Sequence, residues 1–392
     1  MSDFPWNLTF EVAFDVNPAT EPGPTDWTDL TSRVRHGLTV TLGPPDGQAR
    51  GTSHISLNNR DRALDPTYTG ATYNLVPMRH ARITVDAGSG HVPLFRGYVK
   101  QWSPVWPNAA QGIVQVQLVD AFAFIGLQEA NVDLPRQRTH QRVSALLDLA
   151  GWPAGLRDVD DGVVWVEPAE RDDANLLRML ADTADAEDGE LYMSSSGDLT
   201  FRSRHGRFDA TETVQFGGEG LGVAGVDSEW STDRITNIGR VQLEDGTRWE
   251  FVDTTSRTDY GPRAESYRDL PLRKAESVGV AQWVVYRFAE PHLWLDRLAA
   301  YGHVPGQLAD LVGLKPGDRV GFEHTPPGPG NVETSGHVET VTHEVTGGAW
   351  VTTMEVSPYF GEGPWAQWET AAASSGTTWA TAEATEGPRW AP

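Results

Sequence analysis

The amino-acid sequence predicts an α+β protein, predominantly β, with two antiparallel β-barrel-like domains, an inserted helix-helix-hairpin module and a further helix. Three observations lead to this fold class. Apolar and polar residues alternate in several short stretches before residue 120, as in strands that bury one face. Two windows between residues 139 and 188 instead repeat at the spacing of an α-helix. After residue 209 the strand pattern returns and is interrupted by one helical window before Pro291.

The first β region opens with the clearest strand pattern of the chain. Apolar residues occupy every second position from Leu8 to Val16, which is the period of a strand with one buried face. Residues 17–27 contain three prolines and are expected to form a loop. With no convincing helix before residue 120, an antiparallel barrel or sandwich is favoured. Further strands are expected at 38–42, 55–57, 82–85, 92–99 and 114–118.

A long irregular loop separates the strand at 55–57 from the strand at 82–85. Asp65-Pro66 and Gly70 prevent the strand or a helix from continuing, because proline lacks a donor and forces the preceding residue toward extended geometry. The two strands after the loop are joined by a turn at residues 88–90. This part of the chain is therefore expected to consist of a strand, a long loop and a hairpin.

The pattern changes from strand to helix after Leu127. A first helix is expected from a capping Thr139 to Gly151, with its apolar residues at positions i, i+3, i+4 and i+7. A second helix is expected to be capped by Asp172 or Asp173 and to end at Asp188. A hairpin follows, with strands at 190–193 and 199–204.

The second β region contains one more helix and a recognisable turn. Apolar residues from Val278 to Phe288 repeat at helical spacing, and Pro291 marks the end of that helix. Lys315-Pro316-Gly317-Asp318 fits a type II turn, which places proline second and glycine third. The strands expected here lie at 213–216, 238–243, 249–252, 318–323, 336–345 and 349–356.

These patterns divide the chain into four parts. The first β domain is expected at 1–126, the α+β module at 127–208, and the second β domain at 209–360 with an insertion around 245–305. Residues 361–392 are small and polar, so a flexible tail is expected, because such residues bury too little area to offset chain entropy. Large aromatic residues in this tail indicate either docking onto another surface or an idle tail: Trp365, Trp368, Trp379 and Trp390.

The charge and residue content exclude several classes of protein. The chain has 31 basic and 54 acidic residues, a net charge of −23, which argues against binding nucleic acid through its phosphates. An acidic surface would instead repel DNA or keep the protein soluble. The absence of cysteine excludes disulfides, thiolate metal sites and cysteine nucleophiles. No signal-peptide pattern and no run of about 18 apolar residues occurs, so a soluble chain without membrane insertion is expected.

The sequence predicts no catalytic, cofactor-binding or metal-binding residue. A nucleophile elbow of the type G-x-S-x-G is absent. The nearest approach, Gly51-Thr52-Ser53-His54, belongs to a predicted strand rather than to a sharp turn. The two-histidine helix motif H-E-x-x-H is also absent. Residues 217–222 are glycine-rich, but no Lys-Ser/Thr and no helix follows, so a flexible connector is expected instead of a phosphate loop.

One strand nevertheless carries side chains that are able to bind a metal. His337, Glu339 and His343 fall on one face of the strand expected at 336–345. The two histidines would stand roughly 20 Å apart at the rise of a strand, which is too far to share an ion. We therefore expect a solvated or channel-facing strand face. The acidic residues of the α+β module can likewise form carboxylate pairs, but their number follows from composition: Asp158, Asp160, Asp161, Asp172, Asp173, Asp182, Asp185, Glu187 and Asp188.

Short motifs follow one another in a fixed order to about residue 360. They are LNNRDRALDP (57–66), LFRGYVKQW (94–102), LYMSSSGDLTFRSR (191–204), ITNIGRVQ (235–242), TSRTDYGPR (255–263), FAEPHLWLDRL (288–298) and LVGLKPGDRVGF (311–322). Their order resembles that of the tail hub proteins of long-tailed phages, also called tail-associated, minor tail or baseplate hub proteins. In that family three copies form a ring at the end of the tail tube. Each copy carries two tube-like β domains, so three chains present a pseudo-sixfold surface.

The resemblance implies a structural virion protein without enzymatic activity. It would be a homotrimer at the tail tip, assembled in the host cytoplasm, with a tail tube or distal tail protein above it and tip or fibre proteins below. Phage DNA would pass through its channel during ejection without specific binding, helped by acid concentrated toward the bore. No cofactor is implied. The candidate contact surfaces are the loop from Asp65 to Pro77 and the C-terminal tail.

Two alternatives remain open at this point. A tail-associated cell-wall hydrolase would need a catalytic domain, and only about thirty residues follow Phe360. A carbohydrate-binding adhesin would use flat aromatic side chains to stack on sugars. Several tryptophans, however, lie within expected elements, where core packing is the simpler prediction: Trp102, Trp106, Trp165, Trp230 and Trp283.

Overall fold

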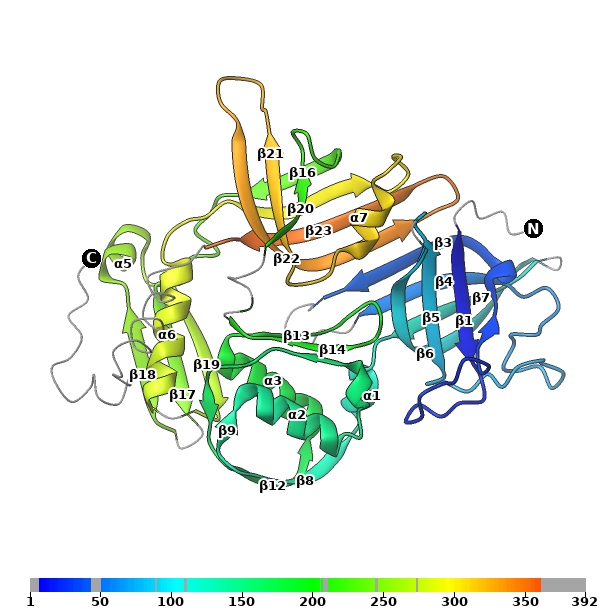
Figure 1. Ribbon diagram of the computed structural model, residues 1–392, viewed down its shortest axis with the longest axis horizontal. Coiled ribbons are helices and arrows are strands. Elements are labelled where there is room, and N and C mark those ends of the chain that lie inside the picture. The colour runs from blue at the N-terminus through cyan, green and yellow to red at the C-terminus, as the bar shows by residue number, and fades with distance from the viewer. Residues whose placement is uncertain are drawn as a thin grey trace.

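Most strands of the protein belong to one large sheet (Figure 1). A computed structural model describes residues 7–43, 51–88, 90–108, 111–204, 206, 211–243, 246–272 and 274–360. Ser89 in the predicted turn and the predicted tail at 361–392 therefore lie outside the described residues. The described part is predominantly β with several helices, which confirms the expected α+β class.

The large sheet has thirteen strands, which form two halves. The first half-sheet, in the order β3-β4-β7-β6-β5-β1-β2, contains β1 (Leu8–Ala13), β2 (Thr28–Asp29), β3 (Val34–Leu42), β4 (Thr52–Asn58), β5 (His80–Asp86), β6 (His91–Asn108) and β7 (Gln111–Val119). The second half-sheet, in the order β16-β20-β23-β22-β21-β15, contains β15 (Glu212–Phe216), β16 (Val223–Glu229), β20 (Trp294–Tyr301), β21 (Arg319–His324), β22 (Val332–Val345) and β23 (Trp350–Pro358).

The two half-sheets are joined by a single strand, β22. Along one edge, β22 pairs first with β21, from Val332 to His337, and then with β3, from Val341 to Val345. A bulge at Glu339 separates the two stretches. This pairing of β22 with β3, called here the β22 junction, makes the two β regions one continuous sheet. Among the described residues the sheet closes no barrel, so the expectation of two barrel-like domains is not confirmed.

The two half-sheets repeat one topology. If β1, β3, β4, β5, β6 and β7 are matched in chain order with β15, β16, β20, β21, β22 and β23, the neighbours in the sheet are the same in both. All matched pairs are antiparallel except one, since β1 pairs with β5 antiparallel while β15 pairs with β21 parallel. The structure therefore contains an internal duplication that has no visible counterpart as a sequence repeat.

Local details of β6 and β22 confirm this match. Each strand has a one-residue bulge against its hairpin partner, at Lys100 in β6 and at Glu339 in β22. Three residues before each bulge stands a glycine, Gly97 or Gly336, and a Cβ at either position would overlap a carbonyl oxygen of the partner strand. A close backbone approach that excludes a side chain explains why glycine occurs at both sites.

The cores of the two half-sheets meet at the β22 junction. Val345 and Trp350, at the end of the β22–β23 hairpin, lie fully buried in the core of the first half-sheet. The helix α7 (Leu308–Gly313) contributes Val312 to that core and Leu311 to the core of the second half-sheet. Burial of this apolar surface joins the half-sheets in addition to the strand pairing.

The α+β module follows β7 and has its own core. It consists of α1 (Phe122–Ile125), β8 (Glu129–Leu134), β9 (Gln137–Arg138), α2 (Thr139–Leu149), β10 (Arg157–Val159), β11 (Trp165–Val166), β12 (Ala169–Asn175), α3 (Leu176–Glu187), β13 (Glu190–Met193) and β14 (Leu199–Arg202). Both predicted helices and the predicted hairpin are present. The short strands β8 to β12 were not predicted.

The caps of both helices differ from the prediction. Asn175 caps α3, since its side chain accepts a hydrogen bond from the Arg178 amide, while Asp172 and Asp173 lie at a bulge in β12. Thr139 is the first residue of α2 and not its cap, and its buried hydroxyl donates to Glu187 over 2.6 Å. Asp188 ends α3 in the left-handed conformation, at φ 51°, as expected for the end of a helix.

A small unit is inserted between β16 and β20. It contains β17 (Ile238–Leu243), β18 (Arg248–Val252), α5 (Thr254–Tyr260), β19 (Ala264–Leu270) and α6 (Lys274–Phe288), and it overlaps the insertion expected around 245–305. The helix α6 was predicted, whereas α5, β16, β19, β20 and α7 were not. Apolar residues of this unit pack against Val164, Val166 and Ala186 of the α+β module.

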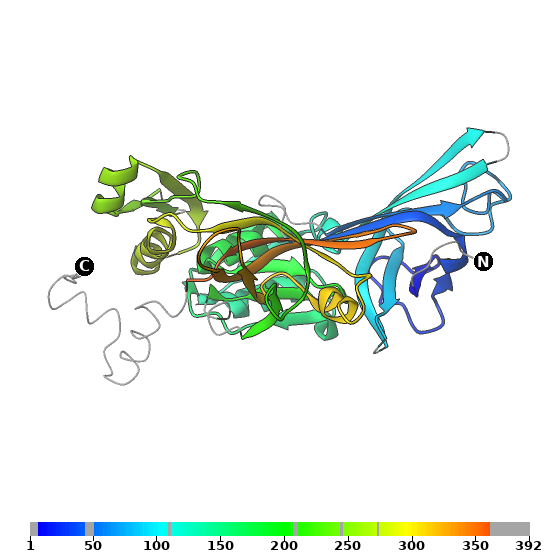
Figure 2. The same cartoon turned by 90° about the horizontal axis from the view of Figure 1, so that it is seen from above.

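The remaining predictions are confirmed with shifted ends. β1 ends at Ala13, so the strand predicted to reach Val16 is shorter, and 17–27 is a loop as expected. Gly317 has φ 84°, as a type II turn requires at its third position. β6 runs to Asn108, well beyond its predicted end, and Figure 2 shows the β6–β7 hairpin (cyan) reaching beyond the rest of the sheet.

The β22 junction leads to a first testable prediction. Gly43, at φ 115°, lies against the bulge so closely that a Cβ would overlap the Glu339 carbonyl oxygen. We expect Gly43→Ala to lower the free energy of unfolding by about 2 kcal/mol more than Gly37→Ala, since backbone overlap is added to the conformational strain. Gly37 is the matched control, because it has φ 75° but only an ordinary contact of 3.7 Å at the same junction. Chemical denaturation measures both, and equal losses would show that the junction tolerates a side chain.

Candidate functional site in the strand edges and module junctions

The metal-binding side chains suggested by the sequence do not form a site. His337 and His343 are both buried in β22, so the expectation of a solvated or channel-facing strand face is wrong for these two residues. The bulge at Glu339 lies between them and interrupts the regular alternation. Among the described residues, no group of three His, Cys, Asp or Glu side chains is placed to hold an ion.

His343 instead forms part of the β22 junction. It pairs with Val40 of β3, its Nδ1 lies 2.9 Å from the Thr352 hydroxyl, and its ring stands edge-on to Trp350. Complete burial lowers the pKa of His343 to about 4. The imidazole is therefore neutral at physiological pH, as a histidine in a core must be.

The other sequence candidates also have structural roles. Ser53 is buried in β4, a strand inside the sheet, so no nucleophile elbow forms there. The glycine-rich residues 217–222 form a tight turn between β15 and β16, in which the Gly217 amide donates to the Leu221 carbonyl over 2.8 Å. This turn packs on Glu323 of β21 and precedes a strand rather than a helix, as expected for a segment that is not a phosphate loop.

The polar residues of the LNNRDRALDP motif fix the loop that follows β4. The Asn59 side chain accepts from the Leu64 amide over 2.8 Å, and Asp61 forms two hydrogen bonds with Arg33 at 2.9 and 2.7 Å. Asp65 is fully buried and accepts from the amide and the hydroxyl of Thr67. The side chains of Asn59 and Asp65 thus accept hydrogen bonds from backbone amides that the loop leaves without a strand partner.

Two buried carboxylates fix the α+β module and its neighbour. Glu187 is fully buried and accepts hydrogen bonds from the Thr139 hydroxyl and the Val164 amide, at 2.6 and 3.0 Å. Asp188 accepts from the Trp283 indole at 2.6 Å and from Arg287 at 2.9 Å, both on α6 of the inserted unit. The sequence suggested only an acidic composition here, and the tertiary partners could not be inferred from it.

A third acidic group lies where the α+β module meets the second half-sheet. Arg202 on β14 donates to Asp160 at 2.9 Å and to both carboxylate oxygens of Asp158. The side-chain hydrogen bond from Arg202 keeps the pKa of Asp158 below its usual value. The nearby Asp318, in the turn before β21, has its pKa raised by burial. Arg202 thus holds Asp158 and Asp160 together at this junction.

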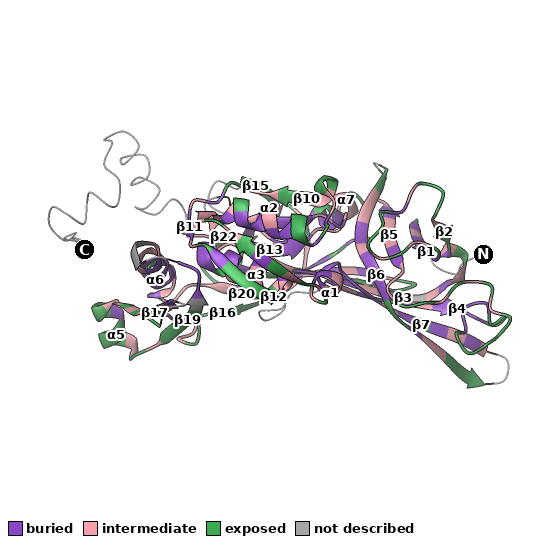
Figure 3. Cartoon of the chain, turned by 90° about the horizontal axis from the view of Figure 1, so that it is seen from below, coloured by how far each residue is buried: buried purple, intermediate pink, exposed green. Residues whose placement is uncertain are grey.

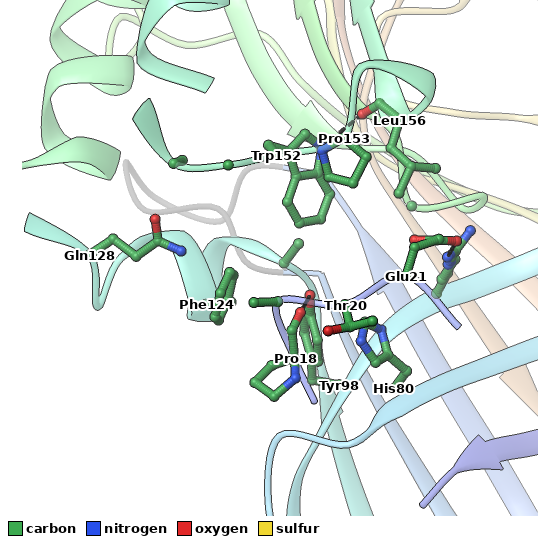
Figure 4. A pocket seen from close by; sticks show the side chains of 17 residues that line it. Pro18, Thr20, Glu21, His80, Tyr98, Phe124, Gln128, Trp152, Pro153 and Leu156 are labelled. Carbon is green, nitrogen blue, oxygen red and sulfur yellow. Dashed lines mark hydrogen bonds and ion pairs between the residues drawn. The ribbon is translucent and has the colours of Figure 1, made fainter. Parts of the chain in front are cut away.

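A cavity of about 200 Å³ lies between the first half-sheet and the α+β module (Figure 4). Aromatic rings of Tyr98, Phe124 and Trp152 line it. The Tyr98 hydroxyl donates to the Pro18 carbonyl at 2.9 Å, and the Trp152 indole donates to the Leu156 carbonyl at 2.8 Å. These polar groups are thus engaged within the protein, and the walls that face the cavity are mainly apolar.

Two of the strand segments that have an open edge in the described part of the chain are β16 and the outer part of β6. Among the described strands, β16 pairs only with β20, so its outer edge is open. On β6, pairing with β5 ends at Tyr98, and the described residues from 100 to 108 have a strand partner only on the β7 side. We call the hairpin of residues 100–108 with 111–116 the β6–β7 arm. Its β7 strand pairs with β4 as far as Ile113, and its end is exposed in Figure 3.

Large aromatic side chains are exposed on both open segments. Trp106, on the β6–β7 arm, is 55% exposed, and Trp230, directly after β16, is 67% exposed. The expectation that these two tryptophans pack in the core is therefore wrong, although Trp102 and Trp283 are buried as expected. Exposed aromatic residues on an open strand edge are typical of a surface that is covered by another chain.

Comparison with known proteins relates the fold to phage tails. No family model and no curated protein matches the sequence. Among solved structures, a tail protein from Neisseria meningitidis has a TM-score of 0.59 at 11% identity, covering 90% of this chain and 96% of the other. The 43 kDa tail protein of prophage MuSo2 from Shewanella oneidensis has a TM-score of 0.57 at 12% identity, covering 90% and 97%.

A secretion component has the same fold. A type VI secretion protein from Escherichia coli, described as similar in structure to tail proteins of bacteriophage T4, has a TM-score of 0.52 at 11% identity and covers 83% of this chain and 73% of the other. The chain therefore has the fold of phage tail proteins, and the resemblance expected from the motif order is confirmed at that level. Among the described residues, no helix has the length and apolar character needed to cross a membrane.

The burial of His343 leads to a prediction about pH. Its folded-state pKa of about 4 lies below the ordinary 6.5, so the unfolded chain binds the proton first as pH falls. Stability should be unaffected by this group above pH 6.5 and should fall by about 3 kcal/mol between pH 6.5 and 4. His343→Gln, which cannot titrate, should remove that part of the pH dependence in denaturation curves.

The exposed Asn74 provides the control for this experiment. Asn74→Gln removes no titratable group and should leave the pH dependence of the wild-type protein unchanged. If the His343→Gln protein loses as much stability between pH 6.5 and 4 as the wild type does, protonation of His343 is not the cause of that loss.

Proposed function

We propose that this protein is a structural virion component: a homotrimeric hub at the distal end of a phage tail tube. The observation that carries the proposal is the duplicated half-sheet, together with the β22 junction that places both copies side by side in one chain. The fold shared with phage tail proteins supports the same conclusion.

The duplication has a direct consequence for symmetry. Three chains with two equivalent half-sheets each would present six similar units around one axis, which is what a threefold ring needs to meet a sixfold tube. The chain would then act as an adaptor between parts of different symmetry. The domain division that goes with this proposal is 1–126 and 209–360 for the two tube-like units, 127–208 for the α+β module, and 361–392 for the tail.

The net charge supports a role as a passage for DNA. A ring of three chains would concentrate three times the charge of −23 around one axis. If acidic side chains face the bore, phage DNA slides through during ejection without adhering, because like charges repel. A cryo-EM map of the ring with a neutral or basic bore would contradict this part of the proposal.

The partners follow from the position of a hub. A tail tube or distal tail protein would bind above the ring and tip or fibre proteins below it, at the virion tail tip, after assembly in the host cytoplasm. For contacts we propose the C-terminal tail, 361–392, and the loop from Asp65 to Pro77. In that loop the Tyr68 amide donates to the Asp65 carbonyl at 3.0 Å, and Tyr68 is 39% exposed.

One alternative has a specific observation in its favour. The aromatic cavity between the first half-sheet and the α+β module would suit a carbohydrate-binding adhesin, because flat rings stack on sugars. Binding of the isolated chain to a glycan array, abolished by Trp152→Ala, would support that reading. A cell-wall hydrolase is tested by peptidoglycan release, which we expect to remain at the level of a buffer control.

The hub proposal predicts the mass of the purified protein. Light scattering at micromolar concentration should give three times the chain mass of 42.9 kDa. The ring should be lost reversibly on dilution or at high denaturant, because it is held by non-covalent contacts alone in a chain without cysteine. A monomer at all concentrations, or a stable dimer, would contradict the proposal.

A further inference from the structure

We infer that the β6–β7 arm of one copy pairs with β16 of a second copy, in the antiparallel arrangement that the β22 junction already shows within one chain. This inference deepens the proposed hub and rests on it for the number of copies. The pairing itself is argued from the internal duplication, the two open edges and the exposed side chains on them.

The β22 junction provides the template. In it, the part of β22 beyond the bulge at Glu339 adds to the edge of β3, with Thr342 opposite Thr41 and Val345 opposite Leu38. By the match between the half-sheets, β6 is equivalent to β22 and β16 is equivalent to β3. The equivalent contact would join β6 beyond its bulge at Lys100 to β16, and no described strand of this chain makes it.

The register of β6 follows from its hairpin. The bulges align Lys100 with Glu339, and from there the hairpin pairs run in step as far as Val105, since Trp102 opposes Val116 as Val341 opposes Met354. Trp106 directly follows Val105, and a second register shift between Val105 and Asn108 affects the pairing of β6 with β7 beyond that point. Ser103 is then equivalent to Thr342, and Trp106 to Val345.

The register of β16 follows from β20. Val226 opposes Leu298 as Leu38 opposes Ile55, and Glu229 opposes Trp294 as Thr41 opposes Thr52. Val226 is therefore equivalent to Leu38, and Glu229 to Thr41. The pairing of β16 with β20 shifts between Asp227 and Ser228 because β20 has one extra residue there. β20 has the same extra residue against β23, so the equivalence of β16 with β3 is unchanged.

Transferring the template gives a specific contact between copies. Ser103 of one chain would lie opposite Glu229 of the next, and Trp106 would lie opposite Val226. The tryptophan after β16, Trp230, would take the place of Leu42 in the template. No two like charges face each other in this register, which is a requirement for strands that pair.

Exposure differs between the two equivalent contacts in the way this inference requires. Val345 and Leu42 are 1% and 3% exposed at the β22 junction, whereas their equivalents Trp106 and Trp230 are 55% and 67% exposed. Equivalent positions are thus covered where the neighbouring half-sheet belongs to the same chain and open where it would belong to another. Covering both tryptophans would bury a large apolar area for each contact.

Prolines on the arm suggest how the edge remains selective. Pro104 and Pro107 have no backbone donor, so a ladder on this edge makes fewer hydrogen bonds than the β22 junction does. Prolines on an open edge also hinder the addition of unrelated strands. The affinity for the second copy would therefore come mainly from the aromatic side chains.

The geometry of the contact leads to a ring. An arm that binds a different surface, β16, on the next copy makes a head-to-tail interface, and such interfaces generate closed rings when the rotation fits. With the β22 junction inside each chain and the arm contact between chains, the sheet would run on from copy to copy around the axis. Three copies with two equivalent units each close it in six similar steps.

A cysteine pair tests the contact, because the chain has no cysteine of its own. In the variant with Ser103→Cys and Glu229→Cys, mild oxidation should give disulfide-linked dimers and trimers on a non-reducing gel, since facing residues of paired strands bring Cβ atoms within disulfide range. Mixing the two single variants should give dimers only. Neither single variant alone should cross-link, because the contact joins two different surfaces.

A matched control places the second cysteine elsewhere. Glu170 is an exposed acidic residue on β12, so Ser103→Cys combined with Glu170→Cys should remain uncross-linked. Trp106→Asp and Trp230→Asp give an independent readout. Each should raise the concentration for half-assembly about tenfold or more, while Leu127→Asp, at a side chain that is 77% exposed, should not change it.

The outcomes separate this inference from the hub proposal. Cross-linked trimers together with weakened assembly of the tryptophan variants support both. A trimer by mass that yields no Ser103–Glu229 cross-link overturns the arm contact and leaves the hub intact. A protein that stays monomeric, with folded variants and no cross-link, overturns the hub proposal and the contact together.

Discussion

The architecture depends on one edge of one strand. β22 is long enough to pair with β21 over its first part and with β3 over its second, and the bulge at Glu339 separates the two stretches. β21 and β3 both form hydrogen bonds with the backbone of β22. The two half-sheets therefore cannot rotate against each other without breaking some of these hydrogen bonds. Trp350 strengthens this constraint, since it belongs to the second half-sheet but is buried in the core of the first.

The remaining units are held to this sheet by buried polar groups. Asp188 joins the α+β module to the inserted unit through Trp283 and Arg287, and Glu187 joins α3 to α2 through Thr139. Removing one partner of such a buried hydrogen bond lowers the free energy of unfolding, because the other polar group stays buried without a hydrogen bond. The acidic residues that looked uninformative in the sequence are therefore structural connections, and the surfaces left open are strand edges.

The sequence predicted the elements whose pattern is local. Strict alternation located β1 and β7, and helical spacing located α2, α3 and α6 with nearly correct ends. β20 was missed because it closely follows Pro291 and carries two adjacent alanines, Ala299 and Ala300, where alternation would show. The pairing of β22 with β3 joins residues about 300 positions apart, and no local pattern encodes it. For the same reason, Trp106 and Trp230 were expected in the core: the sequence shows an apolar strand position but not whether the fold of this chain covers it.

The central claim is that one chain supplies two equivalent tube-like units to a common ring. Cryo-EM of the purified protein, averaged with threefold symmetry only, tests it most directly. The account predicts six β units at one radius, in which first and second half-sheets alternate around the axis. A ring in which only one half-sheet of each chain lies near the axis, or an assembly with another number of copies, would contradict it.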